Sequence, residues 1–424
     1  MQGFDHLVDH VDHIDRYDWV ILGGTEAARQ GAQFAATQGA RVALVEPPLD
    51  KIAIAQLGPR FGQLMRAGVD VVLEDWLWER SPITGKAFSR QFSRLWSRRT
   101  PWLVRTETRW LWGDRYLDAQ PRSQKSHTAL QQTNLPIYRP ETLNQYFAQP
   151  PRQSQNWAIL GGDITAITHA QTLARRGDRI TLLLPNHCLV SGLFNPADRH
   201  LQNILEADGI DIVWDVPFAT FTAELLPPNT DQILVATLPP ARSPDTGPRF
   251  STTSRGQAIT SPHLQTSLPY FYIAGPALGG YTLPTLAESE VLTAIAHGLG
   301  HHPRPLDYGA LPWTIPTTPA ITQWGKTLPQ KNRPVIKLRC DDGGILWALL
   351  EQPFLTTQWQ TKWRSHPKLV GAAGVGDEAQ QAIATLAILG TGLGRSPSLK
   401  DILHIPSRHH QCLKDLALTP FSKA

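Results

Sequence analysis

A glycine-rich turn between two apolar segments is the first part of the sequence that could bind a ligand. Gly23 and Gly24 follow a short apolar run, and residues 25–38 have the composition of a helix. Gly39 ends that helix, and a second apolar run reaches Glu46. A β-turn-α-β unit of this kind places a pyrophosphate on the helix N-terminus and ribose hydroxyls on an acid at the tip of the second strand. The pattern predicts a dinucleotide site at Gly23, Gly24, Thr25 and Glu46.

This glycine fingerprint departs from G-x-G-x-x-G/A at its middle position. The first glycine is Gly23 and the permitted final alanine is Ala28, but Thr25 stands where a glycine lets the backbone approach the phosphates. A βαβ unit that binds no ligand is therefore the alternative interpretation of these residues.

The same pattern returns at residues 157–184, again with a glycine pair, Gly161 and Gly162. Two copies predict an FAD-plus-NAD(P) architecture, with NAD(P) at Gly161 and Gly162. The middle glycine position holds Asp163, however, and the second strand ends in Leu184 and a proline. A carboxylate about 4 Å from a phosphate costs about 4 kcal/mol at an effective dielectric of 20, roughly a thousandfold in affinity. We expect Asp163 to cap its own helix instead.

The composition describes a globular protein of two or three domains. The chain has 424 residues, 41% of them hydrophobic, a formal net charge of +4 and only three cysteines. No apolar run is long enough for a transmembrane helix, and the acidic, histidine-containing N-terminal segment does not resemble a secretory signal. We therefore expect a cytoplasmic protein. The cysteines lie far apart, so they form neither a zinc knuckle nor a local redox pair.

Three clusters of charged or titratable side chains are candidate secondary sites. His6, His10 and His13 would share a helix face, which is either a metal patch or the polar side of an amphipathic helix. The Arg90–Arg109 stripe is either a solvated face or a surface for an acidic partner, a nucleic acid or a membrane. Histidines also gather at residues 404–410 in the C-terminal tail, where a solvated surface is the expectation. We assign no metal and no catalytic residue to these clusters.

Several segments together resemble the FAD-dependent pyridine nucleotide-disulfide oxidoreductases, the family of dihydrolipoamide dehydrogenase and mercuric reductase. The resemblance covers about residues 19–424. It is carried by the two βαβ units and by DRHLQNILEADGIDIV (198–213), DQILVATLPPAR (231–242), LQTSLPYFYIAGPALGGYTLPTLAESE (264–290), PWTIPTTPAITQWGKT (312–327) and KLVGAAGVGDEAQQAIATLAILGTGL (368–393).

The resemblance implies an α/β fold with two Rossmann-type FAD/NAD(P)-binding domains and a C-terminal α+β dimerisation domain. The FAD-binding-like domain would comprise residues 1–150 and 251–310, with Gly275 beside the flavin. The NAD(P)-binding-like domain would comprise residues 151–250. Residues 311–424 would form the dimerisation domain, so the implied assembly is a homodimer.

The same resemblance shows where the family's chemistry is missing. The redox pair C-x₄-C would fall between Pro47 and Met65, which contain no cysteine, so no dithiol exchange is available. The family's Gly-Asp at the flavin is Gly275-Pro276. The family's "ATG" segment against the flavin is not recognisable in residues 120–140. Its C-terminal acid-base pair falls on Pro406 and Gln411, or on Ile405 and His410 after a shift of one residue.

Three hypotheses follow from these observations. The first is a flavoprotein that binds FAD at the first βαβ unit, has lost disulfide reduction and keeps at most a residual FAD-dependent oxidoreductase activity. The second is a cofactor-free pseudoenzyme that acts as a homodimeric scaffold or regulatory partner. The third gives the Arg90–Arg109 stripe a nucleic acid or acidic protein as its partner, with binding that weakens steeply with salt.

Overall fold

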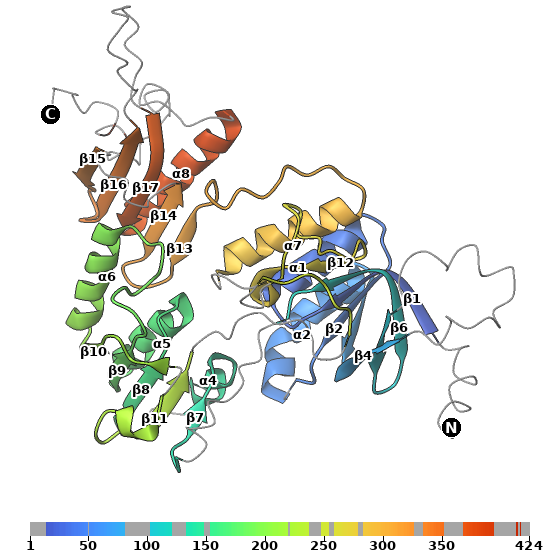
Figure 1. Cartoon of the computed structure of the whole chain (residues 1–424), viewed down its shortest axis with the longest axis horizontal. Helices are drawn as coiled ribbons and strands as arrows, with labels where there is room; N and C mark the ends of the chain where they lie inside the picture. The colour runs from blue at the N-terminus through green and yellow to red at the C-terminus, as the bar shows by residue number, and fades with distance from the viewer. Residues whose placement is uncertain are drawn as a thin grey trace, which may run out of the picture. The chain divides into compact units, whose positions relative to one another are not determined.

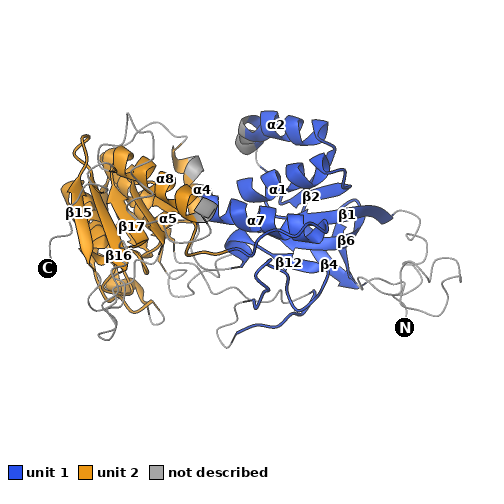
Figure 2. Cartoon of the chain, turned by 90° about the horizontal axis from the view of Figure 1, so that it is seen from above, with its two compact units in different colours: residues 1–123, 239–306 blue, residues 124–238, 307–424 orange. Residues whose placement is uncertain are grey.

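The computed structural model divides into two compact units, which are described separately (Figure 2). Unit 1 contains residues 1–123 and 239–306, and unit 2 contains residues 124–238 and 307–424. The structure describes residues 14–49, 51–80, 102–120, 133–147, 153–218, 221–236, 247–253, 258–278, 283–325, 334–351, 368–393, 413 and 416. Outside these residues lie three of the predicted features: the N-terminal histidines, most of the Arg90–Arg109 stripe (Arg90, Arg94 and Arg98) and the histidines of the C-terminal tail.

Unit 1 is built around a mixed sheet with the strand order β3-β2-β1-β6-β5-β4, in which β12 also pairs with β6. Its parallel part consists of β1 (Ile14–Leu22), β2 (Val42–Glu46), β3 (Val69–Leu73), β6 (Trp110–Asp118) and β12 (Phe271–Ile273). The strands β4 (Trp76–Arg80) and β5 (Trp102–Thr106) extend it in antiparallel fashion. The strands β5 and β6 form a hairpin.

Helices cover one face of this sheet, and aromatic side chains cover the other. Trp19 and Ile21 of β1 belong to the core beneath α1 (Glu26–Thr37), α2 (Lys51–Arg66) and α7 (Pro284–Gly298). Val20 and Leu22 point to the opposite core, which contains Trp78 and other aromatic residues. This alternation is the side-chain period of a strand that is buried on both faces.

The helices α1 and α7 lie side by side in both views of the chain (Figures 1 and 2). Gly31 makes this close approach possible, since a Cβ at that position would clash with Val291 Cγ1 and lie 2.8 Å from Ile295 Cδ1. Gln30 donates a hydrogen bond to Glu288 across the same contact. Residues far apart in the sequence therefore complete one helical layer.

Unit 2 contains a parallel sheet with the strand order β10-β9-β8-β11-β7. Its strands are β7 (Ile137–Tyr138), β8 (Asn156–Leu160), β9 (Arg179–Leu183), β10 (Ile210–Val213) and β11 (Gln232–Val235). The helices are α4 (Pro140–Phe147), α5 (Ile164–Arg175) and α6 (Asn195–Ala207). Because β7 pairs with β11, residues 137–138 belong to this sheet and to unit 2, which begins at residue 124. The domain bounds expected from the sequence stay a prediction.

The C-terminal part of unit 2 is an antiparallel sheet with the order β13-β14-β17-β16-β15. It is formed by β13 (Trp313–Ile315), β14 (Ile321–Gly325), β15 (Val335–Arg339), β16 (Ile345–Glu351) and β17 (Lys368–Val375), with α8 (Asp377–Leu393) packed on β14 and β17. Gln323 connects this sheet to the loop before α6. Its buried side chain accepts a hydrogen bond from Phe194 N at 2.7 Å and donates one to Gly192 O at 2.9 Å. The predicted α/β fold with a C-terminal α+β part is therefore observed.

Candidate functional site

The first candidate site lies at the carboxyl edge of the parallel sheet in unit 1, where β1, β2, β6 and β12 all end. Ligands of open α/β sheets bind at this edge. The structure brings Gly23, Gly24, Glu46 and Gly275 there, as the sequence predicted, because each of them ends or follows one of these strands. Gly23 and Gly275 have positive φ values of 142° and 62°. These conformations explain why glycines occupy both turns.

Thr25 closes the N-terminus of α1 with its own side chain. Its Oγ1 accepts a hydrogen bond from Ala28 N at 3.2 Å and donates one to Ala119 O at 3.3 Å. The first contact is a helix cap, so it uses a backbone N–H that could otherwise meet a phosphate. The second contact connects α1 to the segment after β6. A Cβ on Gly23 would lie 2.6 Å from the same Ala119 O, so this glycine is required for close backbone approach within the chain itself.

Glu46 forms an ion pair with Arg29, a residue that was not among the site residues predicted from the sequence. Arg29 Nε donates to Glu46 Oε1 at 2.9 Å and Arg29 Nη2 donates to Oε2 at 2.8 Å, while Nη2 also bonds Gly24 O at 2.9 Å. Glu46 is fully buried and Arg29 is 6% exposed. Burial raises the pKa of Glu46, and the guanidinium opposes that shift. Both oxygens expected to receive ribose hydroxyls thus already accept hydrogen bonds.

Two further acids lie at this edge of the sheet. Burial raises the pKa of Asp118, the last residue of β6, to about 6, although Gln120 donates to it through its backbone and side-chain amides. Glu290 of α7 is buried and accepts a hydrogen bond from Gly275 N at 2.5 Å. Three acids against one arginine make this edge an unfavourable place for a pyrophosphate. The side chains present therefore fit FAD poorly.

The second candidate site lies at the carboxyl edge of the parallel sheet in unit 2. Gly161 and Gly162 form the turn between β8 and α5, and Asp163 caps α5 by accepting a hydrogen bond from Ala166 N at 2.8 Å. The prediction that Asp163 caps its own helix is confirmed. A Cβ on Gly162 would lie 2.9 Å from Leu184 Cδ2, so the turn packs against the loop that follows β9. The NAD(P) role of Gly161 and Gly162 stays a prediction.

Of the Arg90–Arg109 stripe, the structure describes residues 102–109, which include Arg105 and Arg109. Arg109 donates to both oxygens of Asp70, at 2.9 Å and 3.1 Å, and Tyr17 donates to the same carboxylate. Arg105 pairs with Glu79 at 3.7 Å. These two arginines therefore serve contacts within unit 1.

Cys340, Asp342 and Glu378 form a grouping of possible metal ligands in the described part of the chain. Asp342 accepts backbone hydrogen bonds from Gly344 and Glu378, and Glu378 accepts one from Asp341. The two carboxylates thus stabilise the turn between β15 and β16 and the start of α8. We assign no metal to this grouping. In the same described ranges, no helix is long and apolar enough to cross a membrane.

Two Rossmann-type sheets followed by an antiparallel sheet with one covering helix define the fold of the FAD- and NAD(P)-binding disulfide oxidoreductases. The sequence similarities below are likewise to proteins of the pyridine nucleotide-disulfide oxidoreductase family. The chain is 23% identical to a dihydrolipoyl dehydrogenase of Bacillus subtilis over 283 residues, which cover 58% of this chain and 59% of the relative. It is 29% identical to a mercuric reductase of Streptomyces lividans over 197 residues, which cover 41% and 40% of the two chains. The match thus spans under two thirds of either curated relative, and no family model matches the chain.

The similarity to solved structures extends over nearly the whole chain. LpdA from Mycobacterium tuberculosis superposes with a TM-score of 0.69 at 14% sequence identity, covering 95% of this chain and 98% of that one. The Cu(II) complex of RclA, an HOCl-induced flavoprotein disulfide reductase from Escherichia coli, superposes with a TM-score of 0.67 at 15% identity, covering 94% and 98%. At such identities these superpositions establish the shared fold.

Proposed function

We propose that this chain is a non-redox descendant of the family, a cofactor-free scaffold or regulatory partner that does not reduce disulfides. The observation that carries the proposal is the buried ion pair between Arg29 and Glu46. In this proposal, the chain's own guanidinium takes the place of the ribose hydroxyls. The cytoplasmic location expected from the sequence is part of the same proposal.

Residues that the family uses for its chemistry are absent at several separate positions of the chain, and these absences support the proposal. No cysteine lies between Pro47 and Met65, so the chain has no thiol pair to exchange with a disulfide there. Pro276 stands beside Gly275 in place of a carboxylate. Thr25 and Asp163 occupy the two middle glycine positions and cap their own helices. Each change removes a different function, so selection for a single altered substrate does not explain them all.

Flavin content tests the proposal directly. The purified chain is expected to show no visible flavin absorbance and to leave the fluorescence of added FAD unchanged. Stoichiometric FAD in the protein as isolated, or saturable quenching of added FAD, would contradict it. Arg29→Met frees the Glu46 carboxylate, so FAD uptake by this variant alone would identify the ion pair as the group that closes the site.

A residual FAD-dependent oxidoreductase is the second candidate. It is favoured by the turn at Gly23 and Gly24, which has the position and positive φ of a dinucleotide-binding turn. Reduction of a dye by NADH or NADPH with FAD present would favour this candidate. The same assay without activity, on protein that also fails to bind FAD, would favour the scaffold.

The scaffold proposal includes a homodimer formed through residues 311–424. Family members are usually homodimers, and this region forms an antiparallel sheet with the helix α8 packed on it. Sedimentation at micromolar concentration is expected to give the mass of a dimer. A monomer under these conditions would contradict this part of the proposal.

A further inference from the structure

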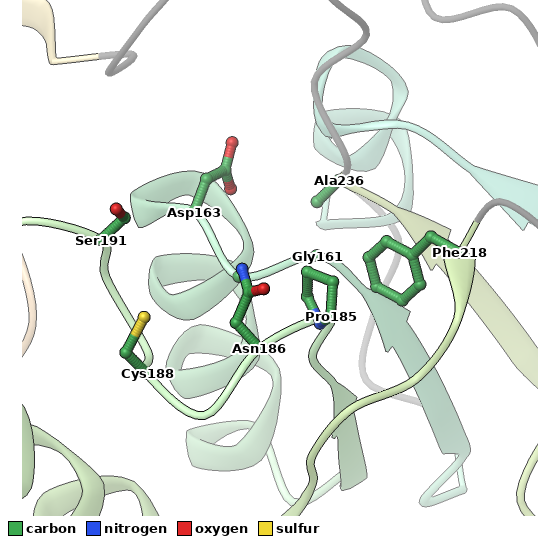
Figure 3. Close-up of a pocket in the computed structure, with 9 residues that line it drawn as sticks. Gly161, Asp163, Pro185, Asn186, Cys188, Ser191, Phe218 and Ala236 are labelled. Carbon is green, nitrogen blue, oxygen red and sulfur yellow. The ribbon is translucent and has the colours of Figure 1, made fainter.

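A pocket of about 210 Å³ lies at the carboxyl edge of the parallel sheet in unit 2 (Figure 3). Drug-sized ligands occupy pockets of about 300–1,000 Å³, so this one suits a smaller molecule than a dinucleotide. The turn between β8 and α5 and the loop that follows β9 form part of its wall. Phe218 and Ala236, the residue directly after β11, complete it. The described residues that line it are Gly161, Gly162, Asp163, Pro185, Asn186, Cys188, Ser191, Phe218 and Ala236.

Asp163 is the one acidic residue among those lining residues, and its carboxyl group is not fully used by the chain. Its Oδ1 accepts the hydrogen bond from Ala166 N, while its buried Oδ2 has no hydrogen-bond partner. Burial raises the pKa of this carboxyl to about 6, so it is ionised at neutral pH. An unpaired carboxylate oxygen beside a pocket favours a ligand that donates hydrogen bonds or carries positive charge.

The charge of the lining argues against an anionic ligand. Of the nine described lining residues, none is a lysine, arginine or histidine. The N-terminus of α5, which would otherwise attract a phosphate, already has Asp163 as its cap. The loop after β9 adds the exposed His187, which is paired with Asp215. The helix α6 adds Asp198, whose carboxylate accepts hydrogen bonds from Leu189 N and Val190 N.

The remaining walls provide an apolar surface and neutral polar groups. Figure 3 shows Phe218 and Ala236 on one side of the pocket and Cys188 and Ser191 on the other, with Pro185 between them. Phe218 and Pro185 therefore offer a surface on which a flat apolar group of a ligand can pack.

We propose that this pocket binds a small organic cation, a primary amine that carries a flat apolar group. The ammonium group lies at the Asp163 carboxylate, and the apolar group lies against Phe218 and Pro185. This inference concerns unit 2 and does not depend on whether unit 1 binds FAD. It replaces the family's anionic ligand by a cationic one.

Three probes of similar shape and different charge test the proposal. Benzylamine, benzyl alcohol and benzoate are titrated into the full chain by calorimetry at about pH 8, where the amine and Asp163 are both ionised. Benzylamine is expected to bind at least about tenfold more tightly than benzyl alcohol, because a hydrogen bond between charged groups replaces a neutral one. Benzoate is expected not to bind. Equal binding of amine and alcohol, or binding of benzoate, would overturn the proposal.

Two carboxylate substitutions locate the site. Asp163→Asn keeps an acceptor for the helix cap but removes the charge, and should weaken benzylamine binding by about tenfold or more. Asp211→Asn makes the same change on an exposed residue of β10 and should leave binding unchanged. Unaltered binding to Asp163→Asn, or displacement of benzylamine by NADH, would refute the assignment. If Asp163→Asn does not fold, the charge series on the unmodified chain still decides the outcome.

Discussion

Arg29 and Glu46 form a two-pronged ion pair at the carboxyl edge of the first sheet, with N–O distances of 2.9 Å and 2.8 Å. Removing one partner of a buried pair leaves the other charge unpaired. Arg29→Ala is expected to lower the free energy of unfolding by about 3–5 kcal/mol, measured by urea denaturation. The double variant Arg29→Met/Glu46→Leu should recover most of this loss. A double variant no more stable than Arg29→Ala would contradict this account of the pair.

The contact between α1 and α7 depends on the missing side chain of Gly31. Gly31→Ala is expected to destabilise the chain by about 1–3 kcal/mol, because the new methyl group meets Val291 and Ile295. Gly62→Ala in α2 is the control, since the nearest atom to a Cβ there is Arg66 Nη1 at 3.7 Å. That control should gain about 0.5–1 kcal/mol from helix propensity alone. Thermal unfolding compares the two variants.

Gln323 provides one acceptor and one donor to the loop before α6. Gln323→Glu replaces the donor to Gly192 O by a second oxygen and buries a charge. We expect a loss of about 2–4 kcal/mol in denaturant unfolding at neutral pH. Gln381→Glu, an exposed change on α8, should stay within about 0.5 kcal/mol of the unmodified chain. Similar losses of stability in both variants would contradict a specific role for the two hydrogen bonds of Gln323.

His297 makes unit 1 sensitive to acid. It stacks on His263 with ring centroids 4.6 Å apart and shares a 3.0 Å hydrogen bond with Tyr272 Oη. Burial lowers its pKa, and the charges of His263, His302 and Arg115 lower it further. A histidine whose pKa falls on folding binds more protons when unfolded, so stability is lost as the pH drops through about 6.5.

His297→Asn keeps an acceptor for Tyr272 and removes this titration. Between about pH 7.5 and 5, the variant is expected to lose less stability than the unmodified chain in urea titrations. His187→Asn is the control, because His187 is exposed and its pairing with Asp215 contributes little. Parallel pH profiles for the unmodified chain and His297→Asn would refute the role of His297.

The architecture could be predicted from the sequence because the apolar runs, the glycine turns and the helical periods all indicated the same order of strands and helices. The strand, turn and helix around Gly23 and their copy around Gly161 have the predicted order, and Asp163 caps its helix as its position suggested. These features depend on residues close together in the chain. The pairing of β7 with β11, which assigns residues 137–138 to the sheet of unit 2, is a contact between distant residues and could not be predicted in this way.

The ion pair that Glu46 forms in the first site could not be predicted in the same way. Glu46 was correctly placed at the sheet edge, but its partner Arg29 lies on the helix and was not among the predicted site residues. One signal was present: Arg29 follows Ala28 and precedes Ala32 on the face that turns toward the sheet, where a charge needs a buried partner. Asp118 reaches the same edge through the pairing of β6 with β1, and Glu290 reaches it through its hydrogen bond with Gly275, which follows β12.

The pairing of β12 with β6, and of α7 with α1, also sets an order of events during synthesis. Residues 14–118 leave the ribosome with one side of β6 open at its carboxyl end and with one side of α1 uncovered. The segments that cover them, 271–273 and 284–298, emerge only after the whole first sheet of unit 2. Domains generally fold as they are made. Here the sheet of unit 2 can be complete while unit 1 still waits for its last strand and helix.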